Sequence, residues 1–207
     1  MSQHESNKLI ARIYGYGRGG AFTPKDFHDL ASHANIRAAL SRLAKDGTIR
    51  RVLRGVYDYP DFSKLMNAPA SPDPEAVAQA YARAHGWTIL PEGNTALNLL
   101  GLSTQVPAHW HYFSDGPSRK VEWLGGTLAF THRGNKEVTG LSPKTGLLVQ
   151  ALKALGESHV DAAALDKLRQ KLTDKERRRA IREAGYATAW VYAAIKQLAA
   201  EAEAPHA

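Results

Sequence analysis

The stretch from residue 23 to residue 60 constrains the fold more than any other part of the chain. It opens with Thr23-Pro24, which is typical of a helix start: the hydroxyl can accept a backbone N–H, and proline is tolerated at the first helical position. Phe27 and Leu30 then fall on one helical face. The sequence therefore predicts a helix that begins at Pro24 and ends near residues 32–34.

A second helix is predicted directly after the first. Ile36, Leu40 and Leu43 recur at the spacing of one apolar helical stripe. On another face Arg37, Ser41 and Lys45 repeat every four residues, with Arg42 at the flank. Asp46-Gly47 then ends the helix. Two helices joined by a short break, the second with a basic face, indicate a helix-turn-helix arrangement.

A β-hairpin is predicted to follow the helix pair. Residues 49–53 and 56–59 read as strands around the Arg54-Gly55 turn. Helices followed by a hairpin are the element order of a winged helix. In such domains the second helix of the pair enters the major groove of DNA, and the hairpin, or wing, lies on the sugar-phosphate backbone.

A proline-rich polar stretch separates this block from the rest of the chain. Residues 61–74 contain three prolines, which neither a helix interior nor a central strand tolerates, so we expect a linker there. The predicted organisation is a winged helix-turn-helix domain at 1–60, a linker at 61–74, and a mixed α/β domain at 75–207 that ends in helices. The fold class is α+β.

The expected second domain has its own turn and cap signals. After the linker, a helix is predicted to end at Gly86. Breaks at Asp115-Gly116, Gly125-Gly126 and Gly134-Asn135 divide residues 109–140 into short strands. From about residue 143 the pattern returns to helix, and Thr173 with Glu176 has the spacing of a capping box.

Positive charge is concentrated in the first 60 residues. They carry 10 of the 27 Lys and Arg residues but only 5 of the 20 Asp and Glu residues. The chain has a net charge of +7 and a pI near 9.6, which favours a polyanionic partner. Because the basic residues fall on the two elements that would meet DNA, we expect double-stranded DNA binding without a cofactor. A winged helix can instead serve as a protein-interaction module.

The expected DNA contacts divide by type. Arginine can bond two guanine acceptors, or two phosphate oxygens, with its planar fork. We assign base-edge contacts to Arg37, Ser41 and Arg42, with Asn35 and His33 as weaker candidates, and phosphate contacts to Lys45, Arg50, Arg51 and Arg54. Since adjacent strand residues point to opposite faces, only part of the Arg50-Arg51 pair can touch DNA.

Enzymatic and membrane functions find little support in the sequence. The chain has no cysteine, no signal-peptide pattern and no apolar run of membrane-spanning length, so a cytoplasmic location is expected. His109 and His111 would share a strand face, with His132 as the nearest third histidine, yet histidines beside aromatic residues more often pack than bind metal. We expect no metal site and no catalytic activity; an RNA- or nucleotide-processing enzyme is the remaining alternative.

Two further polar regions are candidate surfaces for a partner or nucleic acid. One is the region of Ser103, Gln105, Ser118, Arg119 and Lys120, where a contact surface and ordinary turn chemistry around Asp-Gly-Pro-Ser are both open. The other is the basic run at 175–182, in which Arg178 and Arg182 could extend a DNA-binding surface or meet an acidic partner; a solvated helix face is the alternative.

Two blocks of sequence carry a family resemblance. The first runs from FTPKDFHDL to GVYDYP, with Gly55-Val56-Tyr57 ending the basic hairpin, and the second contains LGLSTQVP followed by SDGPSR. Together they resemble the AbiEi-type antitoxins over residues 22 to about 155. The resemblance implies a transcriptional repressor of its own operon that binds inverted repeats in the promoter. It also implies a type IV antitoxin that counters a nucleotidyltransferase-like toxin without necessarily touching it.

This resemblance leaves several outcomes open. We expect the protein to act on its own promoter, with a homodimer on DNA as one arrangement. The alternatives are a stand-alone transcription regulator without a toxin and the protein-interaction module described above.

Overall fold

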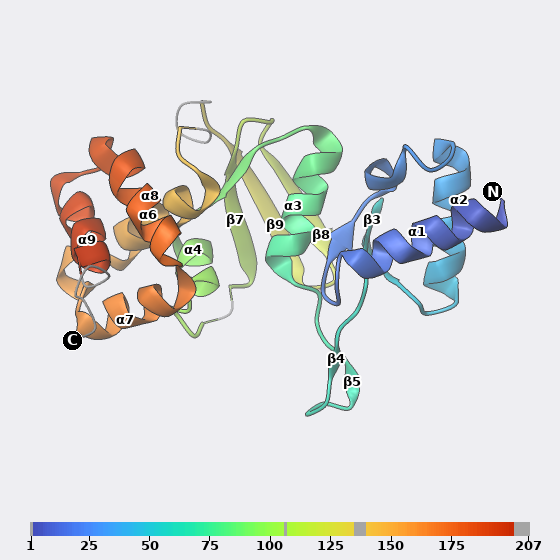
Figure 1. The fold of residues 1–207 in the computed structure, drawn as a ribbon, viewed down its shortest axis with the longest axis horizontal. Coiled ribbons are helices and arrows are strands. Elements are labelled where there is room, and N and C mark those ends of the chain that lie inside the picture. The colour runs from blue at the N-terminus through green and yellow to red at the C-terminus, as the bar shows by residue number, and fades with distance from the viewer. Residues whose placement is uncertain (1, 106, 135–139, 201–207) are drawn as a thin grey trace. The chain divides into compact units, whose positions relative to one another are not determined.

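The fold is α+β in the computed structural model, which describes residues 2–105, 107–134 and 140–200. The chain forms two compact units (Figure 1). The first unit contains Met1–Trp87 and Val121–Leu128, and the second contains Thr88–Lys120 and Ala129–Ala207. The predicted fold class is confirmed.

The first unit begins with a winged-helix arrangement. The antiparallel sheet has the order β1-β3-β2, and Leu9, Phe22, Phe27, Ile36 and Leu40 are buried beneath it and its helices. The elements are α1 (Gln3–Gly15), β1 (Ala21–Phe22), the 3₁₀ turn η1 (Pro24–Phe27), α2 (His33–Lys45), β2 (Arg50–Leu53) and β3 (Val56–Asp58).

The first helix of the predicted pair is much shorter than expected. Residues 24–27 form only a 3₁₀ turn, and the backbone N–H of Leu30 still donates to the carbonyl of Phe27 rather than one residue earlier. Thr23 and Asp26 form a capping box at the start of the turn, and the Thr23 hydroxyl and N–H both donate to Oδ2 of Asp26. Because bonds between residues three apart tighten the backbone, the segment does not become an α-helix.

The predicted linker contains structure of its own. Residues 61–74 include a hairpin of β4 (Phe62–Ser63) and β5 (Ala68–Pro69), followed by the start of α3 (Pro74–His85). Proline ends the β5 strand and opens α3, two positions that tolerate it.

Helix α3 packs in the first unit, although the sequence placed it in the second domain. Arg83 donates to the Ala21 carbonyl at 3.2 Å and bonds Asp26, while Nζ of Lys25 donates to the Ala84 carbonyl at 2.5 Å. The first unit therefore extends past the expected boundary. Gly86 ends α3 in the left-handed conformation, with φ of 71°, as predicted.

The tip of a later hairpin completes the first unit. Strands β8 (Arg119–Trp123) and β9 (Gly126–His132) are joined at the predicted Gly125-Gly126 turn, and Val121–Leu128 belong to the first unit. The Leu124 N–H donates to the Val52 carbonyl of β2 at 3.3 Å.

The second unit combines sheet strands with a helical core. The four-stranded sheet has the order β6-β7-β9-β8, and the predicted Asp115-Gly116 turn joins β7 to β8. Leu148, Leu152, Leu168, Val191 and Ile195 are buried among the helices. The remaining elements are β6 (Ile89–Pro91), α4 (Gly93–Leu99), β7 (His109–Ser114), α6 (Pro143–Leu155), η2 (Glu157–His159), α7 (Ala162–Lys171), α8 (Asp174–Glu183), η3 (Ala184–Tyr186) and α9 (Ala189–Ala200).

The helix start predicted at Thr173 in the second unit is confirmed. Thr173 and Glu176 form the predicted capping box, in which each side chain accepts the backbone N–H of the other residue, at 3.3 and 2.8 Å. The third predicted break, at Gly134-Asn135, runs into residues outside the described ranges. Within those ranges, no helix is both long and apolar enough to cross a membrane.

Candidate nucleic-acid interface

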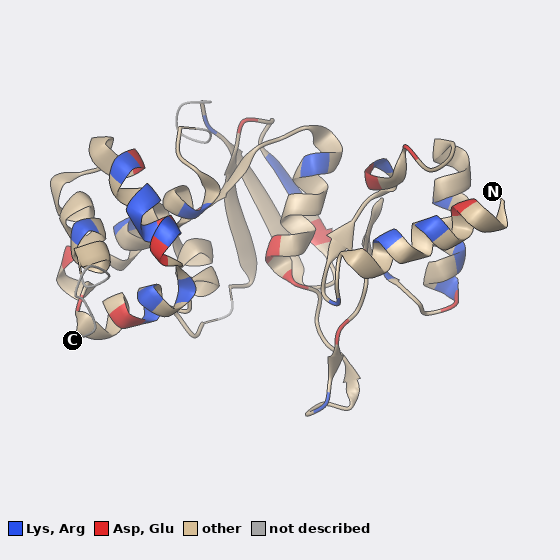
Figure 2. Cartoon of the chain, viewed as in Figure 1, with Lys and Arg blue, Asp and Glu red and all other residues tan. Residues whose placement is uncertain are grey.

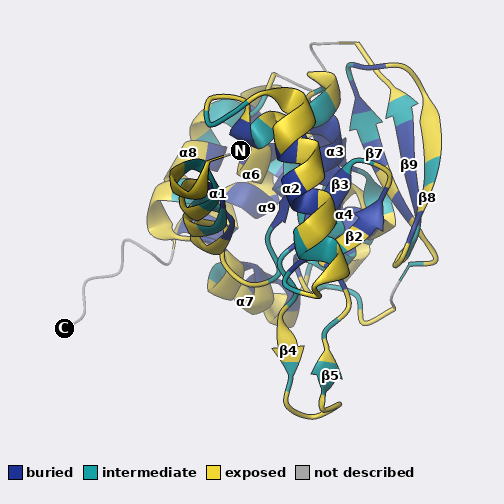
Figure 3. Ribbon diagram, turned by 90° about the vertical axis from the view of Figure 1, so that its right-hand side faces the viewer, coloured by how far each residue is buried: buried dark blue, intermediate teal, exposed yellow. Residues whose placement is uncertain are grey.

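Helix α2 presents a polar, basic surface on an apolar base. Its N-terminus is fixed by Ser32, whose hydroxyl accepts the Asn35 N–H, and Ile36, Ala39 and Leu40 are buried against the rest of the unit. The opposite side is open to solvent (Figure 3). The exposed candidates are Asn35, Arg37, Ser41, Arg42 and Lys45.

The two arginines of α2 lie on opposite flanks of this exposed surface. At about 100° per residue, Arg37 and Arg42 are separated by about 140° around the helix axis. Ser41 and Lys45 lie between these flanks. If α2 entered a groove of DNA with this surface, each wall of the DNA groove would face one guanidinium group.

The wing adds two exposed cations next to a glycine turn. Arg51 and Arg54 are exposed, whereas Val52 and Val56 are buried. Gly55 has a φ of 82°, a left-handed conformation that other residues adopt only with strain. The glycine thus lets β2 and β3 reverse directly after Arg54.

Arg50 is engaged inside the first unit. Its Nε and Nη2 donate to the two carboxylate oxygens of Asp58 at 3.1 and 2.5 Å, across the β2–β3 pair. The Asp58 side chain has no exposed surface, so Arg50 is its counter-ion. The structure therefore places Arg50 apart from the exposed candidates, although the sequence grouped them.

Two more acidic side chains of the first unit, Asp29 and Asp26, are bonded to arginines, whereas Asp46 at the end of α2 is exposed. Arg12 bonds Asp29 with two donors, at 2.5 and 2.8 Å, which raises the pKa of Arg12 and lowers the pKa of Asp29 to about 2. Asp26 is bonded by Arg83 and by Thr23. These pairs remove negative charge from the first unit without using the cations of α2 or the wing.

On α2 and the wing, five basic side chains are exposed and form no ion pair within the described ranges: Arg37, Arg42, Lys45, Arg51 and Arg54. We call these five residues the free cations of α2 and the wing. They come from one helix and one hairpin, and Figure 2 shows basic residues along α2.

A small groove lies between α1 and α2. It has a volume of about 240 Å³, with Leu9, Ile10, Ala39 and Leu43 among its lining residues and Arg42 and Asp46 on α2. The sequence reasoning did not find it, because it depends on how the two helices pack.

Among the polar candidates between residues 103 and 120, the two serines form hydrogen bonds to backbone N–H groups. The Ser103 hydroxyl accepts the Gln105 N–H at 3.2 Å, and the Ser118 hydroxyl accepts the His132 N–H at 2.9 Å. The Ser103 bond is local, whereas the Ser118 bond joins the turn before β8 to β9. Arg119 and Lys120 are exposed at the start of β8.

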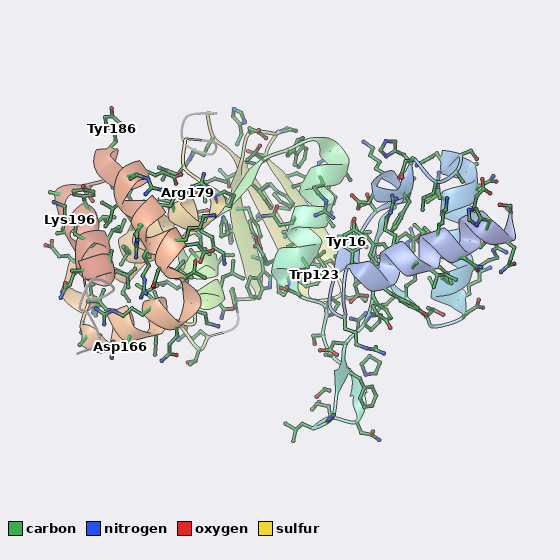
Figure 4. All side chains as sticks on the ribbon, in the orientation of Figure 1. Tyr16, Trp123, Asp166, Arg179, Tyr186 and Lys196 are labelled. Atoms are coloured by element: carbon green, nitrogen blue, oxygen red, sulfur yellow. The ribbon has the colours of Figure 1, made fainter. Side chains whose placement is uncertain are left out.

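Helix α8 carries a second basic surface, in the second unit. Arg177 bonds Asp174 and Arg179 bonds Glu183, while Arg178 and Arg182 are exposed and form no ion pair with any described residue. The Tyr186 side chain beyond the helix projects into solvent (Figure 4).

The histidine pair of β7 borders an open pocket of about 500 Å³. His109 and His111 have ring centroids 6.2 Å apart, and Glu92 and Asn94 also line this pocket. His132 is occupied elsewhere, since its Nδ1 lies 3.0 Å from the Gly116 carbonyl. Among the described residues, no three His, Cys, Asp or Glu side chains are grouped as a metal ion would require.

Comparison with known proteins identifies a family. No curated protein matches the chain. The chain is similar to the crystal structure of the RV2827C protein from Mycobacterium tuberculosis, with a TM-score of 0.43 and 15% sequence identity, over 95% of this chain and 81% of that chain. Residues 8–181 match DUF6088, a family of unknown function, and the chain therefore belongs to that family.

Proposed function

We propose that this protein binds double-stranded DNA in a sequence-dependent manner through α2 and the β2–β3 wing. The observation that carries the proposal is the set of free cations, Arg37, Arg42, Lys45, Arg51 and Arg54, on the two elements that a winged helix applies to DNA. Asp26, Asp29 and Asp58 are each bonded to an arginine outside this set, and Asp46 at the end of α2 is the exposed acid beside it.

The free cations divide into two roles. In this proposal Arg37 and Arg42, on the flanks of α2, bond base edges on either side of the major groove, with Asn35 and Ser41 between or beside them. Lys45, Arg51 and Arg54 lie at the end of α2 and in the wing, and would contact phosphates. Arg50 is left out, because it neutralises Asp58.

The finer function we propose is autorepression coupled to an antitoxin effect. The resemblance of the Gly55-Val56-Tyr57 wing and of the LGLSTQVP and SDGPSR blocks to AbiEi-type antitoxins supports it. In this proposal the first unit binds inverted repeats in the promoter, and the second counters a nucleotidyltransferase-like toxin without catalysis of its own. Co-expression with the neighbouring toxin gene tests this part: growth should be restored by the full chain, and no rescue would refute the antitoxin role.

Fluorescence anisotropy with labelled DNA tests the DNA-binding part. Native promoter DNA should bind more tightly than a scrambled duplex of the same length. Arg37→Ala should reduce the difference in binding free energy between the two duplexes by about 1–3 kcal/mol. Arg54→Ala should instead weaken binding to both duplexes about equally.

Lys153→Ala, an exposed charge on α6 of the second unit, is the control and should leave both affinities unchanged. Equal affinity of the wild-type protein for the native and scrambled duplexes, or no binding at low salt, would refute the proposal.

A further inference from the structure

The hairpin β4–β5 of the first unit carries large apolar side chains in solvent. Phe62, Leu65 and Met66 are 50%, 95% and 74% exposed. Figures 1 and 3 both show the hairpin standing out from the rest of its unit. An isolated two-stranded hairpin is at best marginally stable, and adjacent exposed apolar residues mark interaction sites. We call residues 61–70 the arm.

The arm is internally ordered despite this exposure. Its register pairs Phe62 with Pro69 and Ser63 with Ala68. The Ser63 hydroxyl accepts the Met66 N–H at 3.2 Å, and the Asp61 carbonyl accepts the Ala70 N–H at 2.8 Å. These bonds shape the turn so that Leu65 and Met66 stay at its tip, next to Lys64.

The groove between α1 and α2 is large enough for this tip and has apolar residues in its lining. Its volume is about 240 Å³, and a cavity of roughly 150 Å³ already accommodates a benzene molecule, so there is room for a Leu or Met side chain. Ile10 and Leu43, which are partly exposed, would meet the apolar tip, and the remaining lining includes the polar residues Gln3, Ser6, Arg42 and Asp46.

The charges of the two surfaces are also complementary. Asp46, at the α2 end of the groove, and Lys64, beside Leu65, are both exposed, and neither forms an ion pair within the described ranges. Arg42 also lines the groove, so Lys64 is accommodated only where it lies beside Asp46, and this pairing sets the register of docking.

From this match we propose that the arm docks in the α1–α2 groove of a second copy of the chain. A two-fold pair makes the exchange reciprocal, because each copy offers one arm and one groove. Because each contact involves only a hairpin tip and a small groove, we expect weak association, with a dissociation constant of roughly micromolar. The proposal does not depend on DNA binding, and it is tested without DNA.

Sedimentation velocity over a concentration series is the first test. The wild-type chain should shift from monomer to dimer, and the Leu65→Asp/Met66→Asp variant should weaken dimerisation at least tenfold. Leu124→Asp is the matched control, since Leu124 is 63% exposed on another hairpin of the same unit, and it should dimerise like the wild type. A wild-type monomer throughout, or an arm variant that still dimerises, would overturn the proposal.

Charge reversal tests the register. Lys64→Glu should weaken the dimer, and adding Asp46→Lys in the same chain should restore it. Failure of the double variant to recover would overturn the assigned pairing of arm and groove.

Disulfide trapping then tests the contact itself, because the natural chain has no cysteine. Leu65→Cys on the arm and Ser6→Cys on α1 are mixed as separate full-length variants and oxidised. We expect a Leu65–Ser6 cross-link that exceeds any cross-link formed with Tyr186→Cys, a fully exposed position in the second unit. Dominant Leu65–Leu65 cross-links, or cross-links no more frequent than the Tyr186 control, would overturn docking in the groove.

Discussion

Arg50 and Arg51 are adjacent in β2, and replacing each by alanine should affect the protein in different ways. Arg50 neutralises Asp58, whose side chain has no exposed surface, through two hydrogen bonds. Arg51 points to solvent. The pair therefore separates a role in folding from a role in DNA binding at positions with the same residue type.

The expected loss of stability for Arg50→Ala follows from the geometry. Removing one partner of a buried ion pair costs about 3–5 kcal/mol, because the other charge stays buried and unpaired. Since the Arg50 side chain is 25% exposed, water reaches part of the pair, and we expect about 2–3 kcal/mol. That is a large share of the roughly 5–15 kcal/mol that stabilises a typical protein. Arg51→Ala should change stability by no more than about 0.5 kcal/mol.

Urea denaturation and DNA titration measure the two effects. Arg50→Ala should lower the unfolding midpoint, and adding Asp58→Asn should recover part of the loss by removing the buried charge. Arg51→Ala should keep the midpoint but reduce the slope of log affinity against log salt by about 0.9, the value for one phosphate contact. An equal loss of stability in both single variants, or an unchanged salt slope for Arg51→Ala, would contradict these separate roles of Arg50 and Arg51.

Three further predictions concern the remaining features. The pKa of Glu183 is about 2, because hydrogen bonds from Ser142 and Arg179 outweigh burial, which alone would raise it. Its charged form therefore stabilises the fold above about pH 4.5, and Glu183→Gln should cost about 2 kcal/mol at pH 7 in urea unfolding, a difference that shrinks as the pH falls toward 2. Gly55→Val should cost about 1–2 kcal/mol, since Gly55 has a φ of 82°, and thermal unfolding should show a midpoint lowered by roughly 2–8 °C. For the wild-type protein, phosphate contacts by Lys45, Arg51 and Arg54 predict a salt slope near −2.7 per bound chain, measurable by anisotropy; a slope near zero would contradict them.

Features set by a few neighbouring residues were predictable from the sequence. Thr173 and Glu176 form the expected capping box, and Gly86 ends α3 as its left-handed preference requires. The turns at Asp115-Gly116 and Gly125-Gly126 also lie between strands as expected. Each depends on interactions within four residues, so spacing alone identifies it.

Features that depend on distant partners were not predictable in this way. The pairing of Arg50 with Asp58 requires the β2–β3 register, which no local pattern fixes for a strand with a bulge. The assignment of α3 to the first unit depends on Arg83 and its partners near residues 21–26, about 60 positions away in sequence. The prolines of 61–74 suggested a linker, and only the pairing of Phe62 with Pro69 shows a hairpin there.

The first unit is made of two separate stretches of the chain, so it cannot finish folding until the ribosome has translated the second stretch. The chain leaves this unit at Trp87 and returns to it at Val121–Leu128, where Leu124 bonds Val52. At roughly 5–20 residues per second, a ribosome needs about 2–8 s to translate the 41 residues from 88 to 128. For that interval the nascent winged helix exists without its last hairpin tip. A fragment ending at residue 60 or 87 would keep that incomplete form permanently.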